Sequence, residues 1–251
     1  MVSILTINIG AAAPARAAII LEWLKGRPED VFVLTETSPG LGTKLIFDYF
    51  RRRNCTIACS PFAGKERGVA IVSKLPASQD VSSEFLRVSI PERVAAIRLV
   101  TNPEITIMGL YVPSRNQTPE KVAKKQLYLD TLLQSIDALP ERILRNYIIC
   151  GDYNVIGRDH VPSYRKFLGF EYDFLDSILS RDFVDAFSYL HPAKHEYSWV
   201  GRTGDGYRYD YFHIGANLQG YIAKCEYIHH VRSEQRITDH SALELELRLE
   251  D

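Results

Sequence analysis

The chain has 251 residues, of which 46% are hydrophobic and 24% are charged, an ordinary composition for a globular protein with a full hydrophobic core. Its 30 Lys and Arg residues and 31 Asp and Glu residues give a formal net charge of −1. This balance argues against a protein that binds nucleic acid tightly and non-specifically through overall positive charge. A local basic patch would still suffice for binding. We find no linker, charge block, low-complexity tract or repeat, and therefore expect one domain over residues 1–251.

The cysteines and the N-terminus indicate a cellular compartment. The four cysteines form no CxxC pair and show no zinc-type spacing, so reduced thiols in a cytoplasmic protein are the simplest expectation. The apolar N-terminus has no basic n-region, and no uninterrupted apolar segment is long enough to span a membrane. We expect a cytoplasmic monomer that does not bind membranes.

Apolar periodicity predicts strand-rich blocks with helices between them. The predicted strands are residues 2–8, 31–34, 55–59, 68–73, 81–90, 94–100, 105–112, 146–152, 197–200, 207–214, 224–229 and 242–249. The predicted helices are residues 14–25, 42–53, 118–139 and 163–179. This order predicts an α/β protein with two packed sheets covered by helices, and not a barrel of strict βα repeats.

The most informative stretch is residues 146–154, where an apolar run of strand length ends at Gly151 and is followed by Asp152 and Asn154. Strands that are buried on both faces read as short continuous apolar runs. Glycine permits a sharp turn, and side chains two residues apart on an extended segment can point at one site. Taken alone, the pattern also fits a strand end followed by an Asx turn.

Polar residues also stand at or beside the ends of other apolar runs. They are Asn8, Glu36, Tyr111, Asp210, Asp239 and His240. Each one alone also suits a turn, a helix cap, a half-buried strand position or a hydrogen-bonded loop. Acidic and amide groups that emerge from several strands toward one edge are how α/β scaffolds assemble sites, so the set predicts a functional site.

Short motifs in the same order resemble the exonuclease III/abasic-site endonuclease branch of the endonuclease–exonuclease–phosphatase superfamily. They span nearly the whole chain: residues 7–10 (INIG), 34–37 (LTET), 68–74 (GVAIVSK), 111–114 (YVPS), 151–155 (GDYNV), 183–187 (FVDAF), 190–192 (LHP), 197–199 (YSW), 206–212 (GYRYDYF) and 238–240 (TDH). One such motif would be weak evidence, but a collinear set of this size is strong. The resemblance implies a four-layer αββα sandwich (DNase I-like fold) that hydrolyses phosphate esters with Mg²⁺ or Mn²⁺.

The resemblance also implies roles for single residues. Glu36, with Asn8 and Asp239, would hold the metal, and oxygen ligands of this kind suit Mg²⁺. Asp152 and Asn154 would orient and deprotonate the attacking water. His240 would face the phosphate with Asp210 fixing its tautomer, and Tyr111 would bind a phosphate oxygen or assist the leaving group. Whether Asp152 or His240 is the base, and whether one metal or two are bound, stays open.

Substrate recognition is expected from Trp199, Tyr207 and Tyr209, together with Arg115 and Arg208. The three aromatic residues lie where this branch carries the apolar residues that receive a flipped, baseless sugar, although they could equally be core or strand-face residues. The chain departs from the family pattern at several positions that touch recognition: Gly10, Thr35, Ser38, Val200 and Tyr207 itself.

Three functions remain open at this point. The first is a metal-dependent DNA phosphodiesterase, as abasic endonuclease, 3′→5′ exonuclease or both, acting on double-stranded DNA. The second is a phosphatase or phosphodiesterase for RNA ends, nucleotides or another small phosphate ester. The third is a catalytically silent binding module.

Two other motifs could bind a metal or a phosphate, but both are weaker. His191 and His195 have the spacing of two metal ligands on a helix, but Pro192 breaks the helix. Arg51, Arg52 and Arg53 could bind phosphate, but they also fit a solvated helix end.

Overall fold

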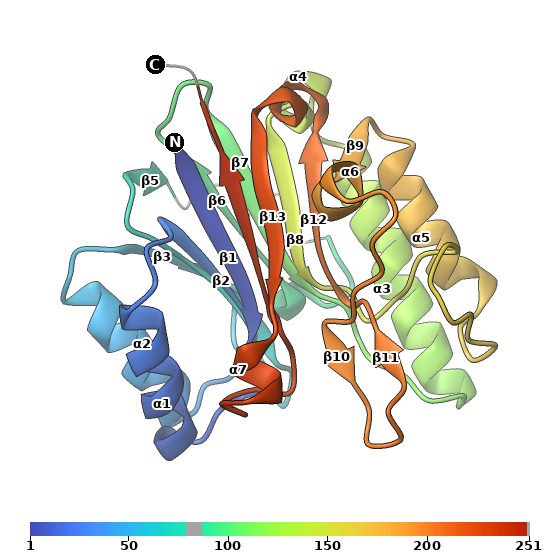
Figure 1. Ribbon diagram of the computed structural model, residues 1–251, viewed down its shortest axis with the longest axis horizontal. Helices are drawn as coiled ribbons and strands as arrows, with labels where there is room; N and C mark the ends of the chain where they lie inside the picture. The colour runs from blue at the N-terminus through green and yellow to red at the C-terminus, as the bar shows by residue number, and fades with distance from the viewer. Residues whose placement is uncertain (79–86, 250–251) are drawn as a thin grey trace.

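A computed structural model describes residues 1–78 and 87–249 as two six-stranded mixed sheets packed face to face, with helices on both outer faces (Figure 1). Helices α1 and α2 cover the outer face of one sheet, and α3 and α5 cover the other. The predicted four-layer α/β sandwich is confirmed. Within the described residues, no helix is both long and apolar enough to cross a membrane.

The first sheet has the strand order β13-β14-β1-β2-β4-β3. Its strands are Val2–Asn8 (β1), Val31–Thr37 (β2), Thr56–Cys59 (β3), Gly68–Ser73 (β4), Ile222–Ile228 (β13) and Ala242–Leu247 (β14). The associated helices are Pro14–Lys25 (α1), Leu41–Arg51 (α2) and the short His230–Ser233 (α7). Strands β1 and β2 run parallel, as a crossover through α1 requires, and the remaining pairs are antiparallel.

The second sheet has the strand order β5-β6-β7-β8-β12-β9. Its strands are Ala77–Ser78 (β5), Val94–Leu99 (β6), Ile105–Tyr111 (β7), Tyr147–Asp152 (β8), Phe183–Asp185 (β9) and Asp210–Gly215 (β12). Its helices are Pro119–Asp137 (α3), Glu141–Leu144 (α4), Gly169–Leu179 (α5) and Ala186–Leu190 (α6), with the 3₁₀ turns Pro91–Arg93 (η2) and Ala216–Tyr221 (η3). Trp199–Val200 (β10) and Gly206–Tyr207 (β11) form a separate hairpin.

Three predicted elements differ from the structure. Most of the strand expected at 81–90 lies outside the described residues, and the described part, 87–90, is turn and bend. The helix expected at 163–179 begins only at Gly169, because Tyr164 and Phe167 pack against the Tyr207 ring. The strand expected at 207–214 is interrupted after Tyr207, because the Ser198 hydroxyl accepts the backbone N–H groups of residues 209 and 210.

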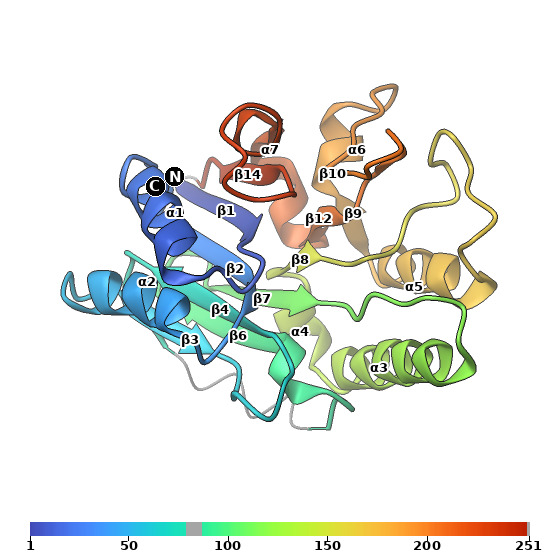
Figure 2. The same ribbon diagram turned by 90° about the horizontal axis from the view of Figure 1, so that it is seen from below.

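The layering brings the ends of several strands together. Strand β1 lies over β8 at the centre of the sandwich, and both strands end at the same edge of their sheets. Figure 2 looks onto this end of the molecule, where α7, the β10–β11 hairpin and the loops after β2, β7 and β8 meet. Polar residues that follow these strands can therefore share one site.

We predict that Gly109→Ala destabilises the sandwich. Gly109 lies on β7 between the two sheets, and an added Cβ would come within 2.7 Å of Val33 Cγ1 and 2.9 Å of Val69 Cγ1. Overpacking of this kind costs about 1–3 kcal/mol. Urea unfolding should show that loss for Gly109→Ala and a much smaller change for Gly220→Ala, whose new Cβ meets no atom within 4 Å. Equal unfolding free energies for the two variants would contradict this packing.

Candidate active site

The second sheet aligns three of the predicted residues in one row. Asp152 ends β8 and is the register partner of both Tyr111 on β7 and Asp210 on β12. All three side chains are buried, with Asp152 only 1% exposed and Asp210 fully covered. Gly151 precedes this row with φ +126°, and a Cβ there would lie 2.2 Å from the Leu110 carbonyl oxygen, so only glycine fits.

The first sheet contributes Asn8 and Glu36. Asn8 ends β1, and its register partner is Thr35 on β2. Glu36 occupies an irregularity in the pairing of β2 with β4 and has φ +56°, a strained conformation for a residue with a side chain. Such local bends re-aim a side chain near functional sites, and here the Glu36 carboxylate turns toward Asn8.

The Asn8 amide connects the two sheets. Its Nδ2 donates to Glu36 Oε1 at 3.1 Å and to Asp152 Oδ2 at 2.9 Å. Its Oδ1 already accepts the Gly10 backbone N–H at 2.8 Å, and its own carbonyl accepts from the Thr238 hydroxyl at 2.6 Å. Through Nδ2, Asn8 orients Glu36 and Asp152. Because its Oδ1 keeps a second lone pair beside the Gly10 N–H, the expected role of Asn8 as a metal ligand stays a prediction.

His240 lies beside the Asp152 carboxylate. Its Nδ1 is 2.8 Å from Asp210 Oδ2, and its Nε2 is 3.8 Å from Asp152 Oδ2. Burial alone would lower the pKa of His240, but the two carboxylates outweigh it and raise the pKa to about 9. Burial raises the pKa of Asp152 to about 7.

The residues fit a hard divalent cation at Glu36 and Asp239. Both line one cavity of about 660 Å³, and Asp239 has one oxygen on the Trp199 indole N–H at 3.0 Å. Oxygen donors of this type suit Mg²⁺ or Mn²⁺. Asp152, Asp210 and His240 also lie close enough together to hold an ion, with ligand atoms within 4.8 Å of one another.

Asn154 and Tyr111 border the same site. Asn154 has φ +47°, its backbone N–H donates to Asp152 Oδ1 at 3.0 Å, and its side-chain nitrogen donates to the Val112 carbonyl at 3.1 Å. The latter bond fixes the orientation of the Asn154 amide. Tyr111 is 5% exposed, and burial together with the Asp152 carboxylate raises its pKa, so the phenol stays protonated.

Two buried charged residues that sequence reasoning missed support Asn154. Lys125 on α3, 1% exposed, donates to the Asn154 carbonyl and to Glu171 Oε1, both at 2.7 Å. Glu171 on α5 also binds Arg115 and is likewise 1% exposed. In sequence, Lys125 sits next to Lys124 in a charged helix and looks like a solvated residue; only the packing of α3 against α5 shows otherwise.

The sequence model of the endonuclease/exonuclease/phosphatase family matches residues 5–240, nearly the whole chain. The chain belongs to this family. The predicted superfamily is thereby confirmed, and members of this family hydrolyse phosphate esters. No curated protein sequence is matched by the chain.

Solved structures with a similar fold include two from Neisseria and one from Archaeoglobus fulgidus. A 3′ phosphatase (NExo) from Neisseria bound to a product DNA hairpin has a TM-score of 0.79 at 17% identity, covering 99% of this chain and 100% of its own. An AP endonuclease from Archaeoglobus fulgidus has a TM-score of 0.77 at 22% identity, covering 99% and 100%. The 3′–5′ exonuclease (NExo) from Neisseria meningitidis has a TM-score of 0.78 at 18% identity, covering 98% and 100%. At these identities the likeness shows the fold.

In this member of the family, the predicted recognition aromatics form a packed cluster. The Tyr207 and Tyr209 rings stack with centroids 5.3 Å apart, and Trp199 lies 5.7 and 6.1 Å from them. Tyr164 and Phe167 close the other side of Tyr207. Tyr207 is 3% and Tyr209 is 9% exposed, so both rings lie within the fold, and their expected role in substrate recognition stays a prediction.

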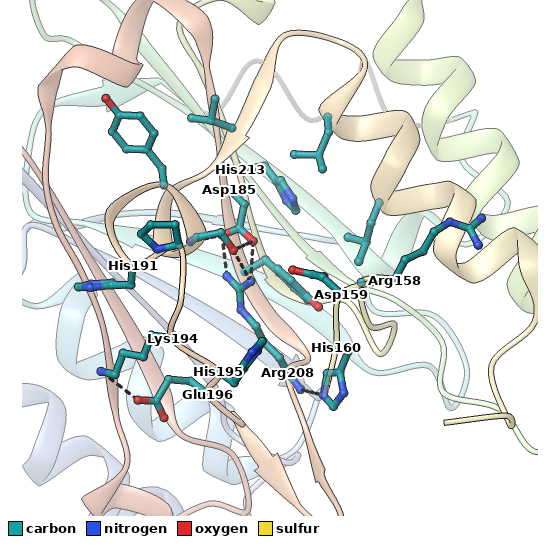
Figure 3. A pocket seen from close by; sticks show the side chains of 18 of the residues that line it. Arg158, Asp159, His160, Asp185, His191, Lys194, His195, Glu196, Arg208 and His213 are labelled. Atoms are coloured by element: carbon teal, nitrogen blue, oxygen red, sulfur yellow. Dashed lines mark hydrogen bonds and ion pairs between the residues drawn. The ribbon is translucent and has the colours of Figure 1, made fainter. Parts of the chain in front are cut away.

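The two predicted substrate arginines are engaged in ion pairs. Arg115 binds Glu171 as described above. Arg208 makes two hydrogen bonds of 2.6 Å to Asp185 and borders a different cavity of about 590 Å³, which His213 also lines (Figure 3). The structure therefore does not bring Arg208 to the Asp152–His240 group, because its guanidinium is directed to Asp185 at the end of β9.

The buried His213 predicts a loss of stability in acid. Burial lowers its pKa from 6.5 to about 4, so the unfolded chain binds a proton there that the folded chain does not. The stability contribution is present above pH 6.5 and is lost as the pH falls toward 4, by up to about 3 kcal/mol. Denaturant unfolding at several pH values should show a shallower decline for His213→Gln. The exposed His195→Gln is the matched control, and an unchanged decline in His213→Gln would contradict the assignment.

Proposed function

We propose that this protein is a divalent-metal-dependent phosphodiesterase that hydrolyses the DNA backbone by in-line attack of an activated water. The proposal covers abasic-site endonuclease activity, 3′→5′ exonuclease activity or both, on double-stranded DNA and by a monomer. The observation that carries it is the Asn8 amide, which holds Glu36 and Asp152 from opposite sheets beside the His240–Asp210 pair.

The charge states favour Asp152 as the base. Burial raises the pKa of its carboxyl group toward the neutral range, and general bases work best when their pKa lies near the operating pH. His240, held protonated by Asp210, would donate a hydrogen bond to a phosphoryl oxygen through Nε2. Asn154 would help orient the water, and Tyr111 would donate to a phosphate oxygen.

The metal would complement these groups. Glu36 and Asp239 would hold Mg²⁺ or Mn²⁺, which would offset the charge on the phosphoryl oxygens. Four carboxylates, those of Glu36, Asp152, Asp210 and Asp239, face this region, and His240 and Arg67 are the cations that contact them. A bound divalent cation would take its oxygen ligands from the Glu36 and Asp239 carboxylates.

Nucleic acid is favoured as the substrate by the similar structures, which are those of an AP endonuclease, a 3′–5′ exonuclease and a 3′ phosphatase bound to a DNA hairpin. One observation favours a second candidate function, a phosphatase that acts on nucleic-acid ends. The Tyr207 and Tyr209 rings stack on each other and are buried, and a terminal phosphate, unlike a flipped sugar, needs no aromatic pocket to receive it.

A substrate panel tests these assignments. We would incubate the protein with labelled duplexes that are abasic, nicked with a 3′ phosphate, or intact, and with bis(p-nitrophenyl) phosphate, with Mg²⁺ and with EDTA. We expect metal-dependent cleavage of at least one DNA substrate. Release of the 3′ phosphate alone would favour the phosphatase for nucleic-acid ends. Turnover of bis(p-nitrophenyl) phosphate alone would contradict DNA as the substrate. No turnover with any metal would favour a binding module without catalytic activity.

Variants test the roles within the site. Asp152→Asn and His240→Gln should each lower turnover by about 10²–10⁴-fold, the range of general acid–base catalysis, in protein that circular dichroism shows to be folded. The exposed Asp130→Asn on α3 is the matched control. Near-normal turnover in His240→Gln would contradict the role of the imidazolium, and near-normal turnover in Asp152→Asn would contradict Asp152 as the base.

A further inference from the structure

The cavity that Arg208 borders contains none of the residues that gather around Asp152. It has a volume of about 590 Å³ and is lined by parts of α5, β9, α6 and β12 and by the loops that contain residues 157–161 and 194–197 (Figure 3). Cavities of about 300–1,000 Å³ are the usual binding sites for small organic molecules in proteins. The size of this cavity therefore suits a small-molecule ligand.

The walls of this cavity are mostly apolar. Leu175 on α5 and Phe183 and Val184 on β9 contribute aliphatic and aromatic surface. Tyr211 adds a ring that lies nearly parallel to the His213 ring, with centroids 5.6 Å apart and planes inclined by 17°. Walls of this kind favour a ligand with a flat apolar body, because removal of apolar surface from water stabilises the complex.

The charges at this cavity do not call for a charged ligand. Each of the arginine and lysine side chains that line it is paired with a carboxylate. The pairs are Arg158–Asp176, Lys194–Glu196 and Arg208–Asp185, with N–O distances of 2.8, 2.9 and 2.6 Å. Asp159 has no ion pair in the part of the chain that the structure describes, but it is exposed to water. Because no charge inside the cavity is left uncompensated, an uncharged ligand fits best.

His213 presents a hydrogen-bond acceptor at this cavity. Its Nδ1 lies 3.0 Å from the Tyr153 hydroxyl, and that hydroxyl donates its own hydrogen to the Ile149 carbonyl at 3.1 Å. Since a hydroxyl has only one hydrogen, Nδ1 must carry the proton that the Tyr153 oxygen accepts. Burial lowers the pKa of His213 to about 4, which keeps the ring neutral at neutral pH. Nε2 is then an unprotonated nitrogen with a free lone pair.

No protein group donates to this Nε2. The bond to Tyr153 is the only hydrogen bond of the His213 ring within residues 1–78 and 87–249, although the residue is only 1% exposed. Nε2 is not sealed by neighbouring atoms, as the unpaired oxygens of Thr6 and Asp210 are, and so opens into the cavity that the ring lines. Buried acceptors in proteins are nearly always paired. A donor group on a ligand would complete the pairing here.

We propose that this cavity, the His213 cavity, binds a small, flat, uncharged organic molecule through an N–H or O–H group that donates to His213 Nε2. The ligand class is an aromatic or heteroaromatic ring system with one donor at its edge and an apolar remainder. The inference does not depend on the proposed function, because the His213 cavity includes neither Glu36 nor His240. Binding there and hydrolysis of phosphate esters can each be found without the other.

Two isomeric probes test the donor. 3-Methylindole and 1-methylindole have nearly the same size and hydrophobicity, but only the first carries an N–H group. NMR titration of ¹⁵N-labelled protein would give both dissociation constants and show which backbone amides respond. We expect 3-methylindole to bind at least about tenfold more tightly, the worth of a hydrogen bond to an acceptor that is otherwise unpaired. The amide shifts should centre on residues 157–161 and 183–185.

Two histidine variants at the same cavity separate the acceptor from its surroundings. His213→Leu removes Nε2 and keeps an apolar side chain, so the preference for 3-methylindole should fall to about twofold or less. His195→Leu, at an exposed position of the same cavity, should keep the full preference. Equal affinities for the two isomers in the unsubstituted protein, no binding of either isomer, or a preference that survives in His213→Leu would overturn the proposal. The comparison of isomers needs no variant and decides the matter even if His213→Leu does not fold.

The protonation of the His213 ring gives an independent readout. Long-range ¹H–¹⁵N spectra distinguish a protonated from an unprotonated ring nitrogen. At neutral pH we expect a protonated Nδ1 and an unprotonated Nε2. The Nε2 resonance should move further with 3-methylindole than with 1-methylindole at equal occupancy. A proton on Nε2 in the free protein would overturn its assignment as the acceptor.

Discussion

The candidate active site depends on one buried amide. Asn8 ends a strand of the first sheet, and its Nδ2 reaches Glu36 in its own sheet and Asp152 in the opposite one. The two amide hydrogens make both bonds, and the amide oxygen accepts the Gly10 N–H. Because unmade buried hydrogen bonds cost about 1–3 kcal/mol, the two sheets, their registers and the site geometry are fixed together. The catalytic arrangement is therefore a property of the sandwich and not of a single loop.

Several elements in the site conflict with local preference. Glu36 and Asn154 adopt positive φ angles, Gly151 approaches the Leu110 carbonyl closely, and Asp210 keeps one buried oxygen without a hydrogen-bond partner. These features gather where four carboxylates converge beside a single imidazole. Such departures persist only where the surrounding structure determines them, and they concentrate at functional sites.

The order of strands and helices and the end-of-strand carboxylates could be predicted from sequence because they follow from periodicity and from collinear motifs. Other features could not. Lys125 looks like any solvated helical lysine until α3 packs on α5, and the His213 cavity is formed by separate segments between residues 157 and 213. The break before Asp210 depends on the Ser198 hydroxyl from another segment. Arg208 was expected at the substrate, but its pairing with Asp185 is a tertiary contact that no local pattern reveals.

The central claim is that Glu36 and Asp239 form a divalent-metal site beside a separate acid–base group made by Asp152, Asp210 and His240. Anomalous diffraction from crystals soaked in Mn²⁺ tests it most directly. The account predicts an anomalous peak at coordination distance from the Glu36 and Asp239 carboxylates, with the His240 ring still hydrogen-bonded to Asp210. A peak held only by Asp152, Asp210 and His240, or no peak in this cavity at all, would contradict it.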